Sequence, residues 1–324
     1  MKFQYLLSIF VWSTLCAPVA FAQSVSPTEL RSAARALTSA EVSGLAIVAS
    51  EGDAGAQIMM GLTLQLYAER LTYDPGERTN LYKSSAYWFR RAAEKDSPPA
   101  LHLLALADLK ISRCDEAVQS LNKAISQNYG PSMTALGQLY VDGKCVKADF
   151  ATGFDWLKKA AAGGDGEADF LIGDAYEQGR GVSADQTKST EWFRKGAQVG
   201  DPASQNQLGI RLADGIGARK DTPTAVEWFR KSADQGNYEG ACNLALHYVR
   251  GEGVPKDFVI ALMWGLIADV NASGIGCLSE IDTSELLSMT STQAAEATDK
   301  ANAWLKEHHY PLTKAPNRAE RPQN

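Results

Sequence analysis

The sequence predicts an all-α protein, a right-handed α-solenoid of stacked antiparallel helix pairs. Three observations predict this class: a period of 36 residues, apolar residues four apart inside each period, and glycines at its boundaries. Tryptophan marks the period most clearly, at Trp156, Trp192, Trp228 and Trp264. A helix pair of this length cannot bury its apolar face alone, so neighbouring pairs are expected to supply the core.

The period that begins at residue 166 shows why each repeat is expected to form two helices. Ala168, Ile172 and Tyr176 recur at intervals of four and mark one apolar face of a first helix. Gly179 follows that helix, and glycine adopts the left-handed conformation that closes a helix end. Asp185 then stands where its carboxylate can accept hydrogen bonds from the free backbone N–H groups of a second helix. A closing glycine and a capping residue recur at the equivalent positions of the neighbouring periods.

The periodic tryptophans are expected in the core and not on a stacking surface, because identical residues at a fixed period are the mark of packing. Residues 53–95 contain one more tryptophan in the same slot, together with an insertion near Tyr67 to Tyr82. The expected structural core therefore includes Trp88, Trp156, Trp192, Trp228 and Trp264.

The repeat resembles a known family. Residues Ser204–Ala233 read SQNQLGIRLADGIGARKDTPTAVEWFRKSA and follow the pattern AxxxLGxxYxxGxGVxxDxxxAxxWxxKA of Sel-one-like repeats, a subclass of tetratricopeptide-like solenoids. The resemblance covers roughly residues 53–270 and implies about six tandem helix-pair repeats over residues 53–271. One of them, residues 96–128, is shorter and has Ser120 where tryptophan is expected, so it is closer to a plain tetratricopeptide repeat.

The segments that flank the repeats have their own signals. Lys2, an apolar run from Tyr5 to Cys16 and the step Ala20-Phe21-Ala22 are typical of a secretory signal peptide over residues 1–22, cleaved near Ala22. A membrane-spanning helix would need roughly 20 apolar residues, more than this run contains. We therefore expect a periplasmic or secreted protein with no transmembrane segment after signal removal.

The rest of the flanking sequence is expected to close the repeat array. Residues 23–52 should form an N-terminal helical lead-in and residues 272–309 C-terminal capping helices. Thr290 or Ser291 can cap the last helix, with Gln293 at the capping-box position. Residues 310–324 contain three prolines among mostly polar residues, which predicts a flexible tail.

The net charge of the chain restricts the classes of partner that it is expected to bind. The formal net charge is −6, and removal of Lys2 with the signal makes it −6 − 1 = −7. Nucleic-acid binding is therefore not expected, because that affinity comes largely from Lys and Arg on phosphates.

Four cysteines of the mature chain, Cys114, Cys145, Cys242 and Cys277, have no C-x-x-C spacing, so neither a zinc site nor a thioredoxin-like pair is indicated. Export would permit disulfides. A disulfide needs Cα atoms within about 7 Å, and stacked repeats lie roughly 10 Å apart. Only the pairs 114–145 and 242–277 join neighbouring units, so these are the expected disulfides; four reduced, buried cysteines remain the alternative.

Neither catalytic nor metal chemistry is expected. Some cysteine-rich secreted members of the family carry a β-lactamase label, which makes a cell-wall or β-lactam-directed hydrolase or binder the alternative function. Ser120 and Lys123 match S-x-x-K, but the companion S-D-N and K-T-G elements are absent and Lys123 lies one period before Lys159. No two histidines form H-x-x-x-H, so neither a metal nor a cofactor is expected.

The remaining candidate is a binding surface. First helices of such repeats line the concave side of a solenoid, where extended partners bind. At 100° per residue, the side opposite the apolar face holds Thr134, Gln138, Phe170, Asp174, Asn206, Ile210 and Leu246. Their variation between repeats suits a binding surface or plain solvent exposure; the apolar Phe170 and Ile210 favour binding. The sequence thus predicts an exported scaffold, adaptor or regulator for a protein or peptide of the envelope.

Overall fold

The computed structural model describes residues 39–70, 74–271, 277–280 and 289–308. The signal peptide expected over residues 1–22, the first part of the lead-in and the tail expected over residues 310–324 lie outside these residues. The described elements are helices, with no strand among them. None of these helices is both long enough and apolar enough to cross a membrane. The all-α prediction is confirmed.

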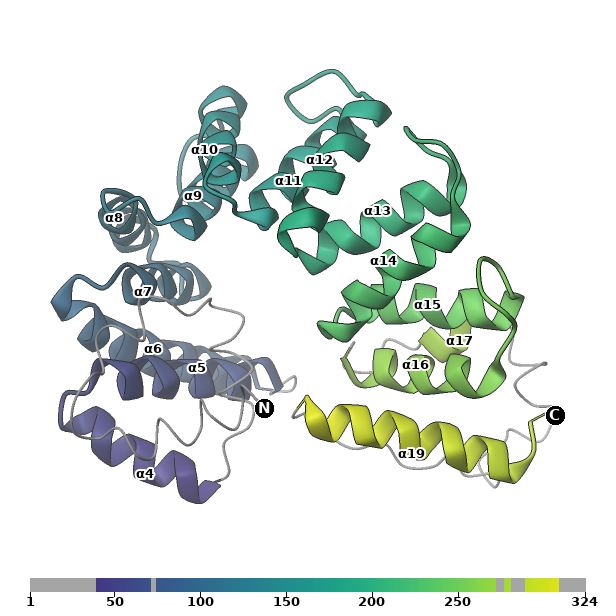
Figure 1. The fold of residues 1–324 in the computed structure, drawn as a ribbon. Helices are drawn as coiled ribbons and strands as arrows, with labels where there is room; N and C mark the ends of the chain where they lie inside the picture. Colours follow the sequence, from purple (N-terminus) through teal and green to yellow (C-terminus); the bar gives the residue numbers. More distant parts are fainter. Residues whose placement is uncertain (1–38, 71–73, 272–276, 281–288, 309–324) are drawn as a thin grey trace. The chain divides into compact units, whose positions relative to one another are not determined.

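The chain divides into two compact units, residues 1–159 and 160–324. In the first unit, successive helices pack on one another from α4 to α9 (Figure 1). They are α4 (Ser39–Ser50), α5 (Ala54–Arg70), α6 (Pro75–Ala92), the 3-10 turn η1 (Ala93–Lys95), α7 (Pro98–Lys110), α8 (Cys114–Ile125) and α9 (Gly130–Asp142). Residues 150–159 of α10 (Phe150–Ala162) complete this unit.

The insertion expected near Tyr67 to Tyr82 lengthens a helix pair. Helices α5 and α6 have 17 and 18 residues, against 13 in α9. The pair closes around Phe89, which is fully buried. A Cβ atom at Gly61 of α5 would lie 2.5 Å from the Phe89 ring, so only glycine lets α5 approach α6 this closely.

The second unit contains the most regular repeats. Its helices are α11 (Gly166–Gln178), α12 (Gln186–Val199), α13 (Pro202–Asp214), α14 (Thr222–Asp234), α15 (Tyr238–Arg250), α16 (Phe258–Asn271), α17 (Cys277–Glu280) and α19 (Ser291–Glu307). Each first helix packs on its own second helix: α11 on α12, α13 on α14, α15 on α16. Helix α19 packs on α16, and Thr290 forms the capping box with Gln293 at its start.

Caps at both ends define each helix of these repeats. Asp165, Asp201 and Asn237 accept backbone hydrogen bonds at the starts of the first helices, and Asp185 and Asp221 do so at the starts of α12 and α14. Gly179, Gly215 and Gly251 close the first helices with φ of 68°, 77° and 70°. Such left-handed positions favour glycine, which explains its place in the period.

The expected tryptophan core needs a correction. Trp264 is 6% exposed, but Trp88, Trp156, Trp192 and Trp228 are half-buried. The fully buried aromatic residue is the next one along the helix, at Phe89, Phe193 and Phe229. Because successive residues of a helix differ in direction by about 100°, the phenylalanine points between the paired helices and the tryptophan lies at the edge of the interface. Lys159, Lys195 and Lys231 place their ammonium groups over the tryptophan rings at 4.3, 3.6 and 3.9 Å.

Candidate binding surface

In the second unit, the first helices α11, α13 and α15 contact one another in a row. They hold five of the residues expected to bind a partner. Phe170, Ile210 and Leu246 are half-buried, and each presents part of an apolar side chain at the surface. The Phe170 ring centre lies 5.7 Å from that of Phe193, so this residue also supports the core.

The polar residues expected in this row are engaged by their neighbours. Arg180 and Gln178 both hydrogen-bond to the carboxylate of Asp174. In the first unit, Gln138 of α9 donates to Asp142 at 2.7 Å. These bonds hold the side chains along their own helices, although both residues keep part of their surface in solvent.

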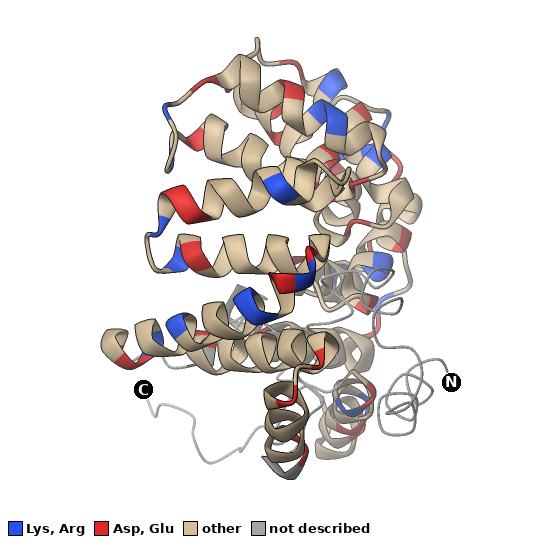
Figure 2. Cartoon of the chain, turned by 90° about the vertical axis from the view of Figure 1, so that its left-hand side faces the viewer, with Lys and Arg blue, Asp and Glu red and all other residues tan. Residues whose placement is uncertain are grey.

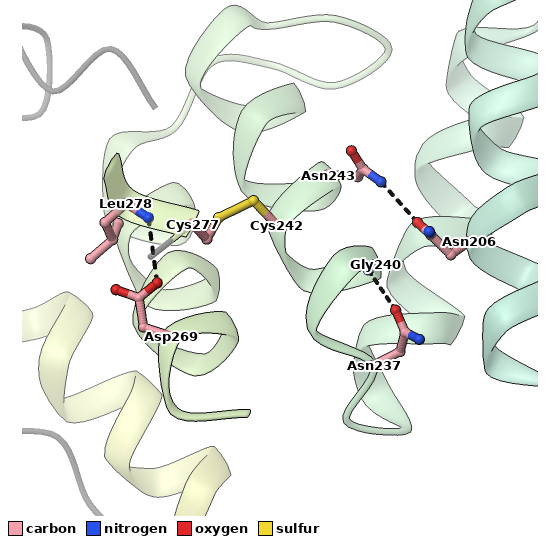
Figure 3. Close-up of a disulfide and its surroundings, with 8 residues drawn as sticks. All are labelled: Asn206, Asn237, Gly240, Cys242, Asn243, Asp269, Cys277 and Leu278. Atoms are coloured by element: carbon pink, nitrogen blue, oxygen red, sulfur yellow. Dashed lines mark hydrogen bonds between the residues drawn. A yellow bond between two sulfur atoms is a disulfide. The ribbon is translucent and has the colours of Figure 1, made fainter. Parts of the chain in front are cut away.

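Two of the expected surface residues are buried, and the prediction was wrong for them. Thr134 of α9 is 2% exposed and Asn206 of α13 is 1% exposed. The Asn206 side chain donates to Glu239 at 3.1 Å. It accepts from Asn243 of α15 at 2.8 Å, as Figure 3 shows. A helical projection considers only the partner helix, whereas a first helix inside a stack is also covered by the first helices beside it. Asn206 therefore joins two repeats and is not a free contact residue.

A buried arginine also joins two repeats. Arg211 of α13 is 1% exposed, and its guanidinium lies 5.4 Å from the centre of the Phe193 ring. It pairs with Glu177 of α11 at 2.7 Å and donates to Ser189 at 3.3 Å. It also hydrogen-bonds the side-chain oxygen of Gln186. A guanidinium has five donors, so it can serve three acceptors at once.

A cavity of about 490 Å³ lies one repeat further along the row. It is bounded by the end of α13, the start of α14, the end of α15 and the loop after it. Its lining includes Ile210, Ala213, Asp214, Lys220, Thr222, Phe229, Asn243, His247, Arg250 and Glu252. Of these, only Ile210 was expected in a site. The signal was present in the sequence, since the slot that holds Leu139 and Ala175 holds Arg211 and His247 in the next two periods.

Positive and negative residues are interspersed along the helices that Figure 2 shows. The described residues contain no cluster of His, Cys, Asp and Glu that could hold a metal ion. The S-x-x-K lysine, Lys123, pairs with Asp96 at 2.5 Å, so this ammonium is engaged away from Ser120.

One buried carboxyl group stands out in the second unit. Asp169 of α11 is 3% exposed. Burial raises the pKa of its carboxyl to about 6; Lys195 opposes the shift, while Asp165 and Asp201 add to it. In the same slot one repeat later, Gln205 donates its side-chain N–H to the carbonyl of Ala197 at 3.3 Å, and Gln57 donates likewise to Ala49 at 3.0 Å. An ionised aspartate cannot make that bond.

The cysteines meet in the two pairs expected from the stacking order. Cys114 joins Cys145 with Cα atoms 5.0 Å apart, and Cys242 joins Cys277 with Cα atoms 5.6 Å apart. The second disulfide ties the short helix α17 to α15, as Figure 3 shows. Asp269 of α16 accepts a hydrogen bond from the backbone of Leu278 and holds the same segment.

The helix pairs, caps and period agree with a comparison against protein families. The Sel1 repeat model matches residues 54–97, 130–165, 166–201, 202–237 and 239–268, more than half of the chain. The chain belongs to the Sel1 repeat family. The pair α7 and α8 falls between two matched segments, in agreement with the departure from the pattern expected for residues 96–128. Sel1 repeat proteins are generally scaffolds for protein–protein interaction.

Solved structures show the same fold. A protective antigen of uropathogenic Escherichia coli with an SLR fold is 28% identical, with a TM-score of 0.51 over 83% of this chain. This chain spans 57% of the length of that antigen. A Sel1 repeat protein from Oxalobacter formigenes is 24% identical, with a TM-score of 0.55 over 72% of this chain and 98% of that one. No curated protein sequence matches the chain.

Proposed function

We propose that this protein is an exported scaffold that binds a protein or peptide of the cell envelope along the row of first helices α11, α13 and α15. The observation that carries the proposal is the half-buried apolar set Phe170, Ile210 and Leu246, of which Ile210 also lines a cavity of about 490 Å³. Apolar residues next to a recess are where a partner's side chains gain most binding energy.

Export is part of the proposal. The basic start, apolar run and Ala20-Phe21-Ala22 step of residues 1–22 support a signal peptide. The pairs Cys114–Cys145 and Cys242–Cys277 support an oxidising compartment, because disulfides persist there and are rare in the cytosol. Periplasmic residence or secretion follows, with the partner in the same compartment.

Paired substitutions in the row test the proposal. Ile210→Ser with Leu246→Ser removes apolar surface from two neighbouring first helices, and capture of envelope proteins by the purified chain should fall at least about tenfold. Val199→Ser is the matched control, because Val199 is 55% exposed at the end of α12, outside the row. A row variant that keeps its melting temperature and still captures the same proteins as the control would show that binding lies elsewhere.

A further inference from the structure

The cavity in the second unit occupies the place that a buried arginine fills one repeat earlier. Arg211 and His247 stand 36 residues apart in equivalent slots, and the backbone carbonyl of each accepts a hydrogen bond from the N–H of the glycine that closes its helix. Arg211 lies over Phe193, and the His247 ring lies over Phe229 at 5.2 Å. The imidazole of His247 is shorter than an arginine side chain, so it covers the Phe229 ring but does not extend beyond it.

The acceptors that hold the Arg211 guanidinium have also been replaced. One period after Glu177 stands Ala213, and one period after Gln186 stands Thr222. Both Ala213 and Thr222 line the cavity, together with His247 and Phe229. The cavity therefore includes the place that the partners of a second such arginine would take in a regular continuation of the repeat.

Two side chains that line this cavity, His247 and Asn243, offer hydrogen-bond acceptors. His247 contacts the backbone carbonyl of Glu252 through Nδ1 at 2.9 Å, and a carbonyl can only accept, so Nδ1 carries the proton. In the neutral imidazole, Nε2 is then a bare acceptor. Asn243 uses its amide N–H on Asn206, which leaves its Oδ1 as an acceptor with no other partner among the described residues.

The rim of the cavity carries balanced charge. Asp214, Glu252, Lys220 and Arg250 line it and are exposed, and none of them forms a side-chain ion pair within the described residues. The rim therefore does not select by net charge. Selection falls to the acceptors inside, which require a ligand with several N–H donors.

We propose that this cavity receives an arginine side chain of the bound partner. The inference rests on the proposed peptide-binding function and names the residue that the partner inserts. A planar guanidinium offers several donors in one plane, which a lysine ammonium does not. The inserted group would occupy, from another molecule, the space beside His247 that corresponds to the Arg211 network of the previous repeat.

Small probes test the inference without knowledge of the partner. Ligand-observed NMR on the full chain compares N-acetyl-arginine methylamide with the lysine and citrulline analogues; citrulline keeps the shape of arginine without its charge. The arginine probe should bind with a Kd on the order of 1 mM, about tenfold more tightly than the lysine probe. Equal binding of the arginine and lysine probes would overturn the inference.

A filling variant provides the sharper test. His247→Arg with Ala213→Glu rebuilds the neighbouring arginine and its carboxylate inside the chain, so the probe should lose its site while the protein melts at or above the wild-type temperature. Glu191→Gln, on the exposed side of α12, is the charge control and should bind the probe normally. Unchanged probe binding in a folded filling variant would contradict the inference.

A second pair of variants decides the matter if the filled protein does not fold. Asp214→Asn with Glu252→Gln leaves Lys220 and Arg250 unopposed at the rim, and probe binding should fall about tenfold. Lys220→Gln with Arg250→Gln should strengthen it instead. No change in either variant overturns the arginine site. Partner capture that still depends on Ile210 and Leu246 in that case would leave the proposed function standing.

Discussion

The repeats α13–α14 and α15–α16 share one backbone plan but use equivalent slots differently. Asn206 in the first hydrogen-bonds across the repeat boundary, whereas Cys242 in the second makes a disulfide to α17. Arg211 fills its slot with a network, whereas His247 leaves a cavity. The positions that close the helices stay constant, and the differences fall where a repeat meets α17 or borders the cavity. The period therefore builds the fold, and departures from it mark the end of the array or the proposed site.

The edges of the two repeats show the same contrast. Trp228 is half-buried under Lys231, whereas Trp264 is buried, with Ile267 in the lysine slot. The Trp264 ring lies 5.9 Å from that of Trp304 in α19. The closing helix α19 therefore covers a surface that a further repeat would cover inside the array. Ile267 replaces the lysine of the earlier repeats because a lysine ammonium would lose its contact with solvent there.

The largest expected effect separates the two aromatic residues of α14. Phe229→Ala should lower the free energy of unfolding by about 3–5 kcal/mol, because it empties a fully buried site. Trp228→Ala should cost about 1–2 kcal/mol, since that ring is half in solvent and the area it buries is smaller. Urea unfolding of both variants measures the difference. If the tryptophan variant lost more stability, the tryptophan would be the core residue as the period alone suggests.

The next effect concerns the disulfide that the last repeat adds. Cys242→Ser with Cys277→Ser should cost about 3 kcal/mol, because the bridge closes a loop of 35 residues in the unfolded chain. Asn206→Ser, in the equivalent slot of the previous repeat, removes only hydrogen bonds and should cost about 1 kcal/mol. Chemical unfolding under matched non-reducing conditions checks both. Equal losses would show that the disulfide adds nothing beyond local packing.

The next smaller expected effect is the difference in stability loss between substitutions of Arg211 and of His247. Arg211→Ala should cost about 2–3 kcal/mol, less than a fully buried pair would, because Glu177 is 38% exposed and can return to water. His247→Ala should cost about 1 kcal/mol, since its slot is already open to a cavity. Differential scanning calorimetry on the two variants checks the order. The reverse order would mean that the Arg211 network contributes specificity and little stability.

The sequence was sufficient for the fold because its period repeats the same physical constraints several times. Gly179, Gly215 and Gly251 each close a helix, and Asp185 and Asp221 each cap the next one. The cysteine pairs followed from the order of the repeats alone. A single repeat, without these recurring residues, would have supported none of these predictions.

The binding surface was harder to predict because it depends on contacts between repeats. A helical projection places Asn206 opposite the apolar face of its own pair, yet Asn243 and Glu239 of the following helix cover it. The cavity at His247 was missed for the same reason. It arises because Ala213 and Thr222 have shorter side chains than Glu177 and Gln186, which hold the equivalent positions one repeat earlier. The changes of residue in these slots are visible in the sequence, but their effect on burial and on the cavity depends on how neighbouring repeats pack.

The smallest expected effect extends the comparison one repeat back, to the slot shared by Asp169 and Gln205. Burial raises the pKa of folded Asp169 to about 6, above the ordinary value near 3.9 of an unfolded aspartate. Between these values the folded state binds more protons than the unfolded state, so the free energy of unfolding falls as pH rises from about 4 to about 6. Asp169→Asn should thus be more stable than wild type by about 1–2 kcal/mol at pH 7 and equal to it near pH 3.5.

Unfolding by urea at a series of pH values measures this difference. Gln205→Asp is the matched reciprocal variant: an aspartate in the equivalent slot should lose the hydrogen bond to Ala197 and acquire the same sign of pH dependence. A stability difference between Asp169→Asn and wild type that is constant from pH 3.5 to 7 would show that the carboxyl does not titrate in this range. The two slots would then differ in packing alone, because a hydrogen bond or a cavity does not change with pH unless a nearby group gains or loses a proton.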